Sequence, residues 1–338
     1  MTKKDVLYAF TGDLVLQDTH NLQPQYFDSI INICNNSSIR LIVNLESPFI
    51  KDNYVTIKNK ICLGAESHSI AILKYLSPTL INLSNNHVND YGNNGIELTN
   101  KLLDENCIPS FGIGKPGNID NIHYTSENII NIAFTLRSAD QSGGLLFATD
   151  SIDGPSDLDL NLVSDTKRLN PEKHLIVSMH WGVEDIPIPD KKTREIARSI
   201  IDSGADVIIG HHPHIIQPVE IYKGKMIFYS LGNFFFPEIK FKFNNVYFTK
   251  RPLKHQRIGI IPVFDFSNSV RLVKILEVKN NKSEQVVEEL ELKKLIKPEA
   301  YYQLFPFLHY KNEMIRLCKY YPKRIIEKIL ICLNLKKN

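Results

Sequence analysis

Short runs rich in Ile, Val and Leu alternate along the chain with longer stretches in which apolar residues recur every three or four positions. The short runs are typical of buried strands, and the longer stretches are typical of helices that cover a sheet, so the pattern predicts an α/β fold. We expect strands at 6–10, 41–44, 79–83, 129–134, 174–178, 205–209 and 225–229. Between them we expect helices at 25–35, 67–75, 95–106 and 193–203.

The pattern changes toward the C-terminus. Two apolar runs between Arg257 and Val278 are separated by a turn-rich link at 266–269, which predicts an antiparallel hairpin. After Lys297, apolar and basic residues alternate in one or two amphipathic helices with a break near Pro322. We therefore divide the chain into a domain of residues 1–280 and a C-terminal helical extension of residues 281–338. The extension either packs on the domain or lies as a basic helix on an anionic membrane surface.

Composition excludes several classes of protein. The 40 basic and 37 acidic residues give a net charge of only +3, so we expect no nucleic-acid partner. The five cysteines are scattered without a CxxC spacing, which indicates neither a disulfide framework nor a cysteine zinc site. With no signal-peptide pattern and no long apolar run, we expect a cytoplasmic location, or contact with the inner membrane surface through the C-terminal helices. The sequence does not indicate an oligomeric state.

Polar side chains follow the expected strands, one group after another. Asp13 comes after the first strand, and Asn44 and Glu46 end the second. The third is followed by a loop that contains Asn86 and His87. The C-terminal ends of parallel strands meet at one edge of a sheet, where ligands bind, so these groups can converge. Each also has an ordinary alternative, as a turn residue, a surface charge or a helix cap.

Histidines follow the later strands. His180 comes after the strand at 174–178, and His211, His212 and His214 follow the strand at 205–209. Three imidazoles in four positions offer little packing advantage, and neutral imidazole is the commonest metal ligand, so this segment predicts a metal-binding loop. A last polar loop, which contains Asn233, follows the strand at 225–229 and is either the wall of a pocket or ordinary core.

In order and spacing these segments resemble the bacterial capsule synthesis protein CapA family. The resemblance rests on Gly12-Asp13, Asn44-Leu45-Glu46-Ser47-Pro48, Asn85-Asn86-His87, His180-Trp181-Gly182, His212-Pro213-His214 and Ser230-Leu231-Gly232-Asn233-Phe234. That family takes part in poly-γ-glutamate capsule production and is related to the calcineurin-like metallophosphoesterases. The resemblance covers residues 5–236 and implies a four-layer α/β/β/α sandwich with a metal centre at the strand ends.

The resemblance also implies a role for each residue. Asp13 and His214 would hold a first metal, with Glu46 in the bridging position. The second metal would be held by Asn86, His180 and His212, and the acid that protonates the leaving group would be His87. Candidates for the substrate pocket are Asn44, Asn85, Trp181, His211 and Asn233. Related enzymes begin this series with Asp-x-His, whereas here Leu14 and Val15 follow Asp13, so a single-metal site remains an alternative.

These residues predict a CapA-like capsule biosynthesis protein with a metal-dependent, phosphoesterase-like hydrolase site. Carboxylate, amide and imidazole ligands suit one or two divalent ions of manganese, iron or zinc. The expected substrate is a phosphorylated or anionic polymer. Two alternatives are a non-catalytic scaffold or export component for an anionic surface polymer, and a hydrolase of amide bonds in such a polymer. Neither HExxH nor GxSxG occurs, which argues against a zinc peptidase of that type and against a serine hydrolase.

Overall fold

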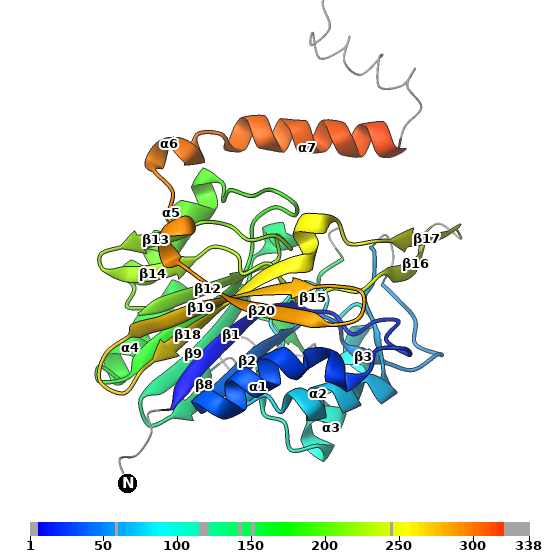
Figure 1. Cartoon of the computed structure of the whole chain (residues 1–338), viewed down its shortest axis with the longest axis horizontal. Helices are drawn as coiled ribbons and strands as arrows, with labels where there is room; N and C mark the ends of the chain where they lie inside the picture. Colours follow the sequence, from blue (N-terminus) through cyan, green and yellow to red (C-terminus); the bar gives the residue numbers. More distant parts are fainter. Residues whose placement is uncertain are drawn as a thin grey trace, which may run out of the picture.

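The computed structural model describes residues 6–57, 60–114, 122–140, 144–149, 153–243 and 246–320. Its frame is two β-sheets packed face to face, with helices on both outer faces (Figure 1). The larger sheet has the order β20-β19-β18-β1-β2-β5-β6, with β15 paired to β1. Its strands are β1 (Leu7–Leu14), β2 (Ile39–Leu45), β5 (Leu80–Asn82), β6 (Ser110–Phe111), β15 (Asn233–Phe235), β18 (Ile258–Asp265), β19 (Arg271–Asn280) and β20 (Gln285–Leu290).

The smaller sheet has the order β13-β14-β12-β11-β9-β8. Its central strands β9, β11, β12 and β14 are parallel, and the edge strands β8 and β13 are antiparallel to their neighbours. The six strands are β8 (Ile122–Ser126), β9 (Ile129–Thr135), β11 (His174–His180), β12 (Val207–His211), β13 (Val219–Tyr222) and β14 (Lys225–Phe228). In the larger sheet, β1, β2, β5 and β6 are likewise parallel. Each sheet therefore brings several C-terminal strand ends to one edge.

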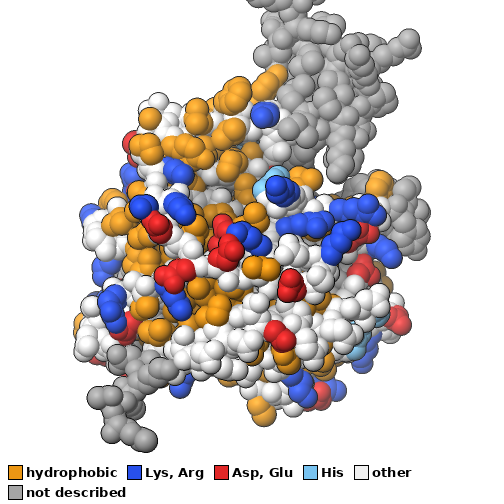
Figure 2. Space-filling view, viewed as in Figure 1, with side chains coloured by type: hydrophobic (Ala, Val, Ile, Leu, Met, Phe, Trp, Pro, Cys, Tyr) orange, Lys and Arg blue, Asp and Glu red, His pale blue; other side chains and the backbone are white. Residues whose placement is uncertain are grey.

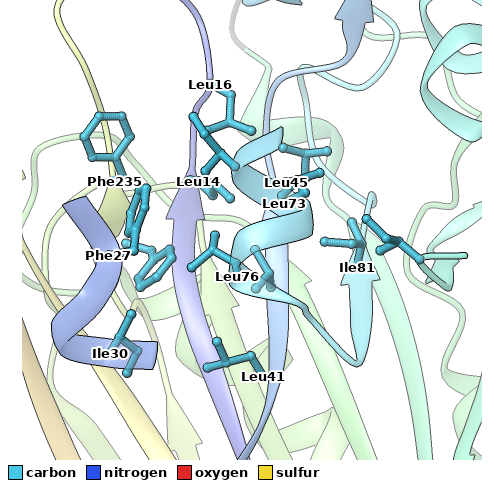
Figure 3. Packing of buried hydrophobic residues seen from close by; sticks show 14 of the residues in the cluster. Leu14, Leu16, Phe27, Ile30, Leu41, Leu45, Leu73, Leu76, Ile81 and Phe235 are labelled. Atoms are coloured by element: carbon cyan, nitrogen blue, oxygen red, sulfur yellow. The ribbon is translucent and has the colours of Figure 1, made fainter. Parts of the chain in front are cut away.

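Three hydrophobic cores separate four layers. On the outer face of the larger sheet, α1 (Asp28–Ser37), α2 (Ile70–Leu76) and α3 (Gly92–Glu105) bury residues such as Ile30, Leu73 and Leu76 in one core with Leu14 (Figure 3). Between the sheets lie apolar side chains of both, including Phe10, Phe264, Ile176 and Phe228. The third core joins the smaller sheet to α4 (Leu160–Leu169) and α5 (Lys191–Asp202). The predicted α/β/β/α sandwich is confirmed.

Most predicted elements are present, and the hairpin expected near 257–278 is the antiparallel pair β18 and β19. The strands extend further toward their C-terminal ends than the apolar pattern predicts: β1 reaches Leu14, β11 reaches His180 and β12 reaches His211. Their last residues are polar yet still paired, as His180 is with His211, because hydrogen bonding between strands does not depend on the side chain. Helix α4 was not among the predicted helices.

The boundary predicted at residue 280 falls inside the larger sheet. Residues 285–290, which the sequence places in the C-terminal extension, form β20 and pair with β19. The helical part begins later, with α6 (Glu299–Tyr302) and α7 (Phe305–Tyr320). Arg194 of α5 holds α6 to the domain, because its guanidinium lies 3.8 Å above the Tyr302 ring and 2.6 Å from the Glu299 carboxylate. Residues 321–338 of the predicted extension lie outside the described residues.

Three two-stranded ribbons complete the fold: β3 (Phe49–Ile50) with β4 (Ala65–Glu66), β7 (Ile113–Gly114) with β10 (Gly154–Pro155), and β16 (Ile239–Phe243) with β17 (Val246–Lys250). Within the ranges that the structure describes, none of the helices has the length and apolar character needed to cross a membrane.

Candidate metal centre

The ends of parallel strands from both sheets form the candidate site. Asp13 lies at the end of β1, where it pairs in register with Asn44 of β2. Glu46 directly follows β2, and His180 is the last residue of β11. His212 directly follows β12. Strand pairing thus sets the positions of side chains that are far apart in the sequence.

The potential ligand side chains form two groups. Within each group, the atoms that could bind a metal ion all lie within 4.8 Å of one another. The first consists of Asp13, Glu46 and His214, and the second of Glu46, His180 and His212. Glu46 belongs to both. Its Oε1 lies 3.6 Å from Nε2 of His180 and 3.7 Å from Nε2 of His214. One carboxylate therefore stands between two potential cation positions.

Asn86 extends the second group. Its Oδ1 lies 2.9 Å from Nε2 of His180, while its Nδ2 donates a hydrogen bond to the backbone carbonyl of Ala139 at 3.2 Å. That second bond orients the amide so that its oxygen, which can bind a cation, faces His180. The structure thus brings together all six side chains for which a ligand role was predicted: Asp13, Glu46, Asn86, His180, His212 and His214.

The chemistry of the buried atoms fits a bound cation. Both carboxylate oxygens of Glu46, Nδ1 of His180 and Nδ1 of His212 are buried without a hydrogen-bond partner among the described residues. Leaving buried polar atoms unpaired is costly, and native structures rarely do so without a reason. Oxygen and imidazole donors without thiolates suit divalent manganese, iron or zinc. The residues present therefore fit a metal ion.

The backbone of the histidine loop is strained. His212 has φ 96° and His214 has φ 57°, both in the left-handed region that side chains other than glycine rarely adopt. Such residues cost roughly 1–3 kcal/mol each and persist where the surroundings hold them in place. Here the N–H of His212 donates to Oδ2 of Asp13 at 3.2 Å, and Nδ2 of Asn233 donates to the carbonyl of His214 at 3.2 Å. With this backbone conformation His212 belongs to the second ligand group and His214 to the first.

Burial and neighbouring charges raise the pKa of one site residue, Glu46, and lower those of two others, Asp13 and His212. Burial raises the pKa of Glu46 well above its usual range. Burial also raises that of Asp13, but hydrogen bonds with His211 and His214 outweigh it and hold the pKa well below the usual value. For His212, burial lowers the pKa to about 4. A neutral imidazole of this kind keeps a lone pair free for a metal ion.

Three of the predicted pocket residues instead support Asp13 and His214. Nδ2 of Asn44 donates to Oδ1 of Asp13 at 2.8 Å, and Nδ1 of His211 lies 3.1 Å from the same oxygen. Oδ1 of Asn233 lies 3.0 Å from Nδ1 of His214. These side chains are almost fully buried and fix the direction of the ligands, as outer-shell partners do in metal sites.

The two other pocket candidates, Trp181 and Asn85, are held by contacts within the protein. Trp181 is fully buried in the core between the smaller sheet and its helices, where its indole N–H donates to the carbonyl of Tyr229 at 2.9 Å. Asn85 is fully buried as well, and its amide bonds to the carbonyl of Leu45 and the N–H of His87. Asn85 thus shapes the loop, and Trp181 packs in the core. The sequence cannot reveal this because a polar loop residue and an indole suit either role.

An apolar side chain stands at the position where the first motif would have its second ligand, a histidine. Val15, where Asp-x-His would place its histidine, is fully buried in a small apolar cluster with Leu63, Phe236 and Ile239. The first ligand group therefore has a single imidazole, that of His214. A cation held by this group would have fewer protein ligands than one held by the second group, where Asn86 adds its oxygen.

Sequence reasoning missed three charged residues beside the site. Asp90 accepts a hydrogen bond from the ring of His87, and the buried Lys60 pairs with Asp90. The charges of Lys250 and several histidines outweigh the effect of burial on Glu184 and lower its pKa to about 2. Asp90 lay within a loop that the sequence singled out, so its proximity to His87 was a usable signal. Lys60 and Glu184 carried none, because single charged residues usually lie on a solvated surface.

Fold and site together define a four-layer α/β sandwich with a candidate metal centre at its strand ends. The chain belongs to the family of the bacterial capsule synthesis protein PGA_cap, whose family model matches residues 8–238. It is 34% identical over 200 residues to the PGA biosynthesis protein CapA of Bacillus subtilis, an alignment that covers 58% of this chain and 52% of that protein.

Two other relatives have related names. The capsule biosynthesis protein CapA of Bacillus anthracis is 34% identical over 58% of this chain and 50% of its own length. A probable polyglutamine synthesis accessory protein of Mycobacterium tuberculosis is 26% identical over 57% of this chain and 54% of its own length. The chain thus spans about half the length of the curated relatives it matches. A novel phosphatase from Mycoplasma pneumoniae superposes with a TM-score of 0.46 at 10% identity, covering 85% of this chain and 92% of that one.

Proposed function

We propose that this chain acts in the biosynthesis of capsule or poly-γ-glutamate and carries a metal-dependent, phosphoesterase-like hydrolase site. The observation that carries the proposal is the pair of ligand groups that share Glu46, whose two buried carboxylate oxygens have no hydrogen-bond partner among the described residues. Membership of the capsule synthesis family supports the biological setting. The names of the Bacillus relatives point to the same setting.

The ligand roles follow from the two groups. Asp13, Glu46 and His214 would hold one divalent cation, and Glu46, His180, His212 and Asn86 a second, with manganese, iron or zinc as the candidates. Such a cation, when bound, supplies Lewis acidity that polarises a phosphoryl oxygen and acidifies a water. Asn44 and His211 keep the Asp13 carboxylate in place by hydrogen bonding to its Oδ1.

His87 is suited to be the general acid. It follows Asn86 in the chain, and its Nδ1 lies 2.6 Å from Oδ2 of Asp90. This contact engages one ring nitrogen, so that in the imidazolium form Nε2 carries the proton that goes to the departing oxygen. A proton donor beside a ligand, but not itself a ligand, completes a hydrolase site for a phosphorylated or anionic polymer.

The proposal is tested by combining metal analysis with hydrolysis assays. Purified protein is loaded separately with manganese, iron or zinc and assayed on p-nitrophenyl phosphate and bis(p-nitrophenyl) phosphate. We expect bound metal, and hydrolysis that falls by about 10²–10⁴-fold in His87→Ala while the metal content stays the same. Absence of bound metal in the wild-type protein, under all three conditions, would contradict the proposal.

A non-catalytic role in assembly or export of an anionic polymer is the second candidate. The observation that favours it is Val15, because a buried apolar side chain stands where the metallophosphoesterase motif has an imidazole. Protein that binds metal, binds poly-γ-glutamate and hydrolyses neither ester with any of the three metals would support this function.

The C-terminal helices support a location at an anionic membrane surface. Three large hydrophobic side chains are exposed around the start of α7, those of Leu304, Phe307 and Tyr310. Figure 2 shows hydrophobic side chains on the part of the surface where α6 and the start of α7 lie in Figure 1. The sequence that follows is rich in lysine and arginine, whose charge attracts anionic lipid headgroups.

A further inference from the structure

A buried lysine lies beside the candidate metal centre and belongs to neither ligand group. The side chain of Lys60, between β3 and β4, is only 5% exposed, and its Nζ lies 2.8 Å from Oδ1 of Asp90, whose side chain is fully buried. The same ammonium donates a hydrogen bond to the backbone carbonyl of Asn86. Lysine is almost never buried unless it is paired, and here it is buried close to a site that attracts cations. Its position calls for a specific explanation.

The partner of Lys60 connects it to the proposed acid. The Asp90 carboxylate contacts Nζ of Lys60 through Oδ1, while its Oδ2 lies 2.6 Å from Nδ1 of His87 and accepts the N–H of Leu63 at 2.7 Å. The segment that carries Lys60 is thereby joined to the loop that carries Asn86 and His87. A second link is the bond from the N–H of Ile57 to the carbonyl of Asp90 at 2.9 Å.

We propose that Lys60 is a positioning residue of the hydrolase site, acting on His87 through Asp90; the proposal rests on the function proposed above. The ammonium holds the Asp90 carboxylate where it accepts the Nδ1–H of His87. That bond fixes the tautomer and the direction of the ring, so that Nε2 carries the lone pair or proton that meets the substrate.

The chemistry of the leaving group separates positioning from mere structural support. Protonation of the departing oxygen matters most when that oxygen is a poor leaving group, and little when it leaves readily. A variant that misdirects His87 should therefore lose more activity on an ester of phenol than on the matching ester of p-nitrophenol. General damage to the fold or to metal binding would lower both activities by one factor.

The decisive experiment compares Lys60→Met with the wild-type protein, both loaded with the same metal. The substrates are phenyl and p-nitrophenyl phosphate, or diphenyl and bis(p-nitrophenyl) phosphate, whichever pair the wild-type protein hydrolyses. We expect kcat for the phenyl ester to fall by about tenfold or more, that for the p-nitrophenyl ester by less than about threefold, and bound metal to be unchanged. Equal losses on both esters, or no loss on either, would overturn the proposal.

Further variants distinguish a positioning role of Lys60 from a general loss of stability. Lys60→Arg keeps the positive charge and should recover most of the activity on the phenyl ester. Lys167→Met is the matched control, because Lys167 also pairs with a buried carboxylate, Asp206 at 3.0 Å, but at the start of β12 instead of its end. It should lose stability without changing the ratio of the two activities. If Lys60→Met does not fold, Asp90→Asn breaks the same link from the other side and should give the same preferential loss.

A spectroscopic measurement separates this proposal from the function on which it rests. In ¹⁵N-histidine-labelled wild-type protein, the Nδ1–H of His87 should give a strongly downfield proton signal, assigned by its absence in His87→Gln. We expect that signal to shift or disappear in Lys60→Met and to remain in Lys167→Met. A signal that is unchanged in Lys60→Met overturns the positioning role even if the protein hydrolyses esters. If neither ester is hydrolysed by wild-type protein, the hydrolase proposal fails, and the signal alone decides whether Lys60 positions His87.

Discussion

The backbone N–H of His212 donates a hydrogen bond to Oδ2 of Asp13 at 3.2 Å. The two residues are 199 positions apart, one beside the smaller sheet and the other on the larger sheet. The bond therefore joins the facing layers at their shared edge, and it helps to hold His212 in a left-handed conformation. Because the same side chains form the ligand groups, metal binding and stability of the sandwich should be coupled.

Removal of metal should lower the melting temperature. A cation present at a hundred to a thousand times its Kd stabilises the folded chain by about 3–4 kcal/mol, which for a chain of this size amounts to roughly 4–6 °C. We expect a chelator to lower the Tm of metal-loaded wild-type protein by that amount in differential scanning calorimetry. His212→Ala should respond much less. An identical Tm with and without metal would count against the site.

Substitution of the shared carboxylate should remove more metal than substitution of a ligand that belongs to one group. Glu46→Gln keeps the size of the side chain and deletes the charge that both groups use. Because burial raises the pKa of Glu46, the metal-free protein should tolerate the neutral amide with little loss of stability. Elemental analysis should find less metal in Glu46→Gln than in His214→Ala, whose side chain contributes to the first group alone. Equal metal content in the two variants would refute the bridging role.

Much of the site could be predicted from the sequence because strand ends are visible in the pattern. Asp13, Glu46 and His180 each follow an apolar run, and parallel strands place such residues at one edge. The orientation of side chains behind the ligands could not be predicted. Trp181 faces a core and His211 contacts a ligand because of packing between layers, which leaves no periodic trace in the sequence.

The contacts of Lys60 and the extent of the larger sheet were hidden for related reasons. Lys60 pairs with Asp90, 30 positions along the chain, and a single lysine outside a regular element gives no indication of burial. Strand β20 is an edge strand with two consecutive exposed glutamates, Glu288 and Glu289, so its apolar alternation is weak. Its place in the sheet follows from its pairing with β19. The sequence predicts a hairpin only over 257–278, the segment that forms β18 and β19.

Close approach of two backbones at Gly12 should make this position intolerant of any side chain. A Cβ on Gly12 would lie 2.0 Å from the carbonyl oxygen of Gly232, which accepts the N–H of Asp13 at 3.0 Å. Gly12→Ala should separate β1 from β15, shift Asp13 and lower the free energy of unfolding by several times the cost of the control variant. We expect lost metal as well, measured by urea unfolding and elemental analysis.

The control for Gly12→Ala is Gly224→Ala. Gly224 has φ 75°, but a Cβ there would meet nothing within 4 Å. Its substitution should cost about 1–2 kcal/mol from the left-handed backbone conformation alone and leave metal binding unchanged. If the two variants lost equal stability and bound equal metal, close packing at Gly12 would not explain its presence.

The stability contributed by Asp206 should depend on pH. Burial raises the pKa of Asp206, but hydrogen bonds from Lys225, the N–H of Leu175 and Lys167 outweigh it, and the pKa lies below the usual value. A carboxyl with a depressed pKa stabilises the folded state fully above its unfolded pKa of about 3.9, and that contribution is lost as the pH falls through the folded pKa. Asp206→Asn should therefore cost about 1–3 kcal/mol at pH 7. In urea unfolding the difference from wild type should shrink below about pH 4; a constant difference would disagree with this mechanism.

Contact with an anionic membrane should require the segment after α6. Leu304, Phe307 and Tyr310 are 46%, 66% and 44% exposed, and the following residues are rich in lysine and arginine. Deletion of residues 304–338 removes this segment but keeps Glu299 and Tyr302, which hold α6 to the domain. The full chain should float with phosphatidylglycerol-containing vesicles in low salt, and the shortened chain should stay at the bottom of the gradient.

Salt and lipid charge identify the source of that binding. Electrostatic attraction is screened over about 8 Å at physiological ionic strength, so flotation should weaken as salt is added and should be absent with pure phosphatidylcholine vesicles. The full chain carrying Phe307→Ser and Tyr310→Ser keeps every basic residue and should float less than wild type, because burial of aromatic surface adds to the attraction. Flotation that is unaffected by the deletion would show that the tail packs as an ordinary part of the protein and that its exposed apolar residues serve another purpose.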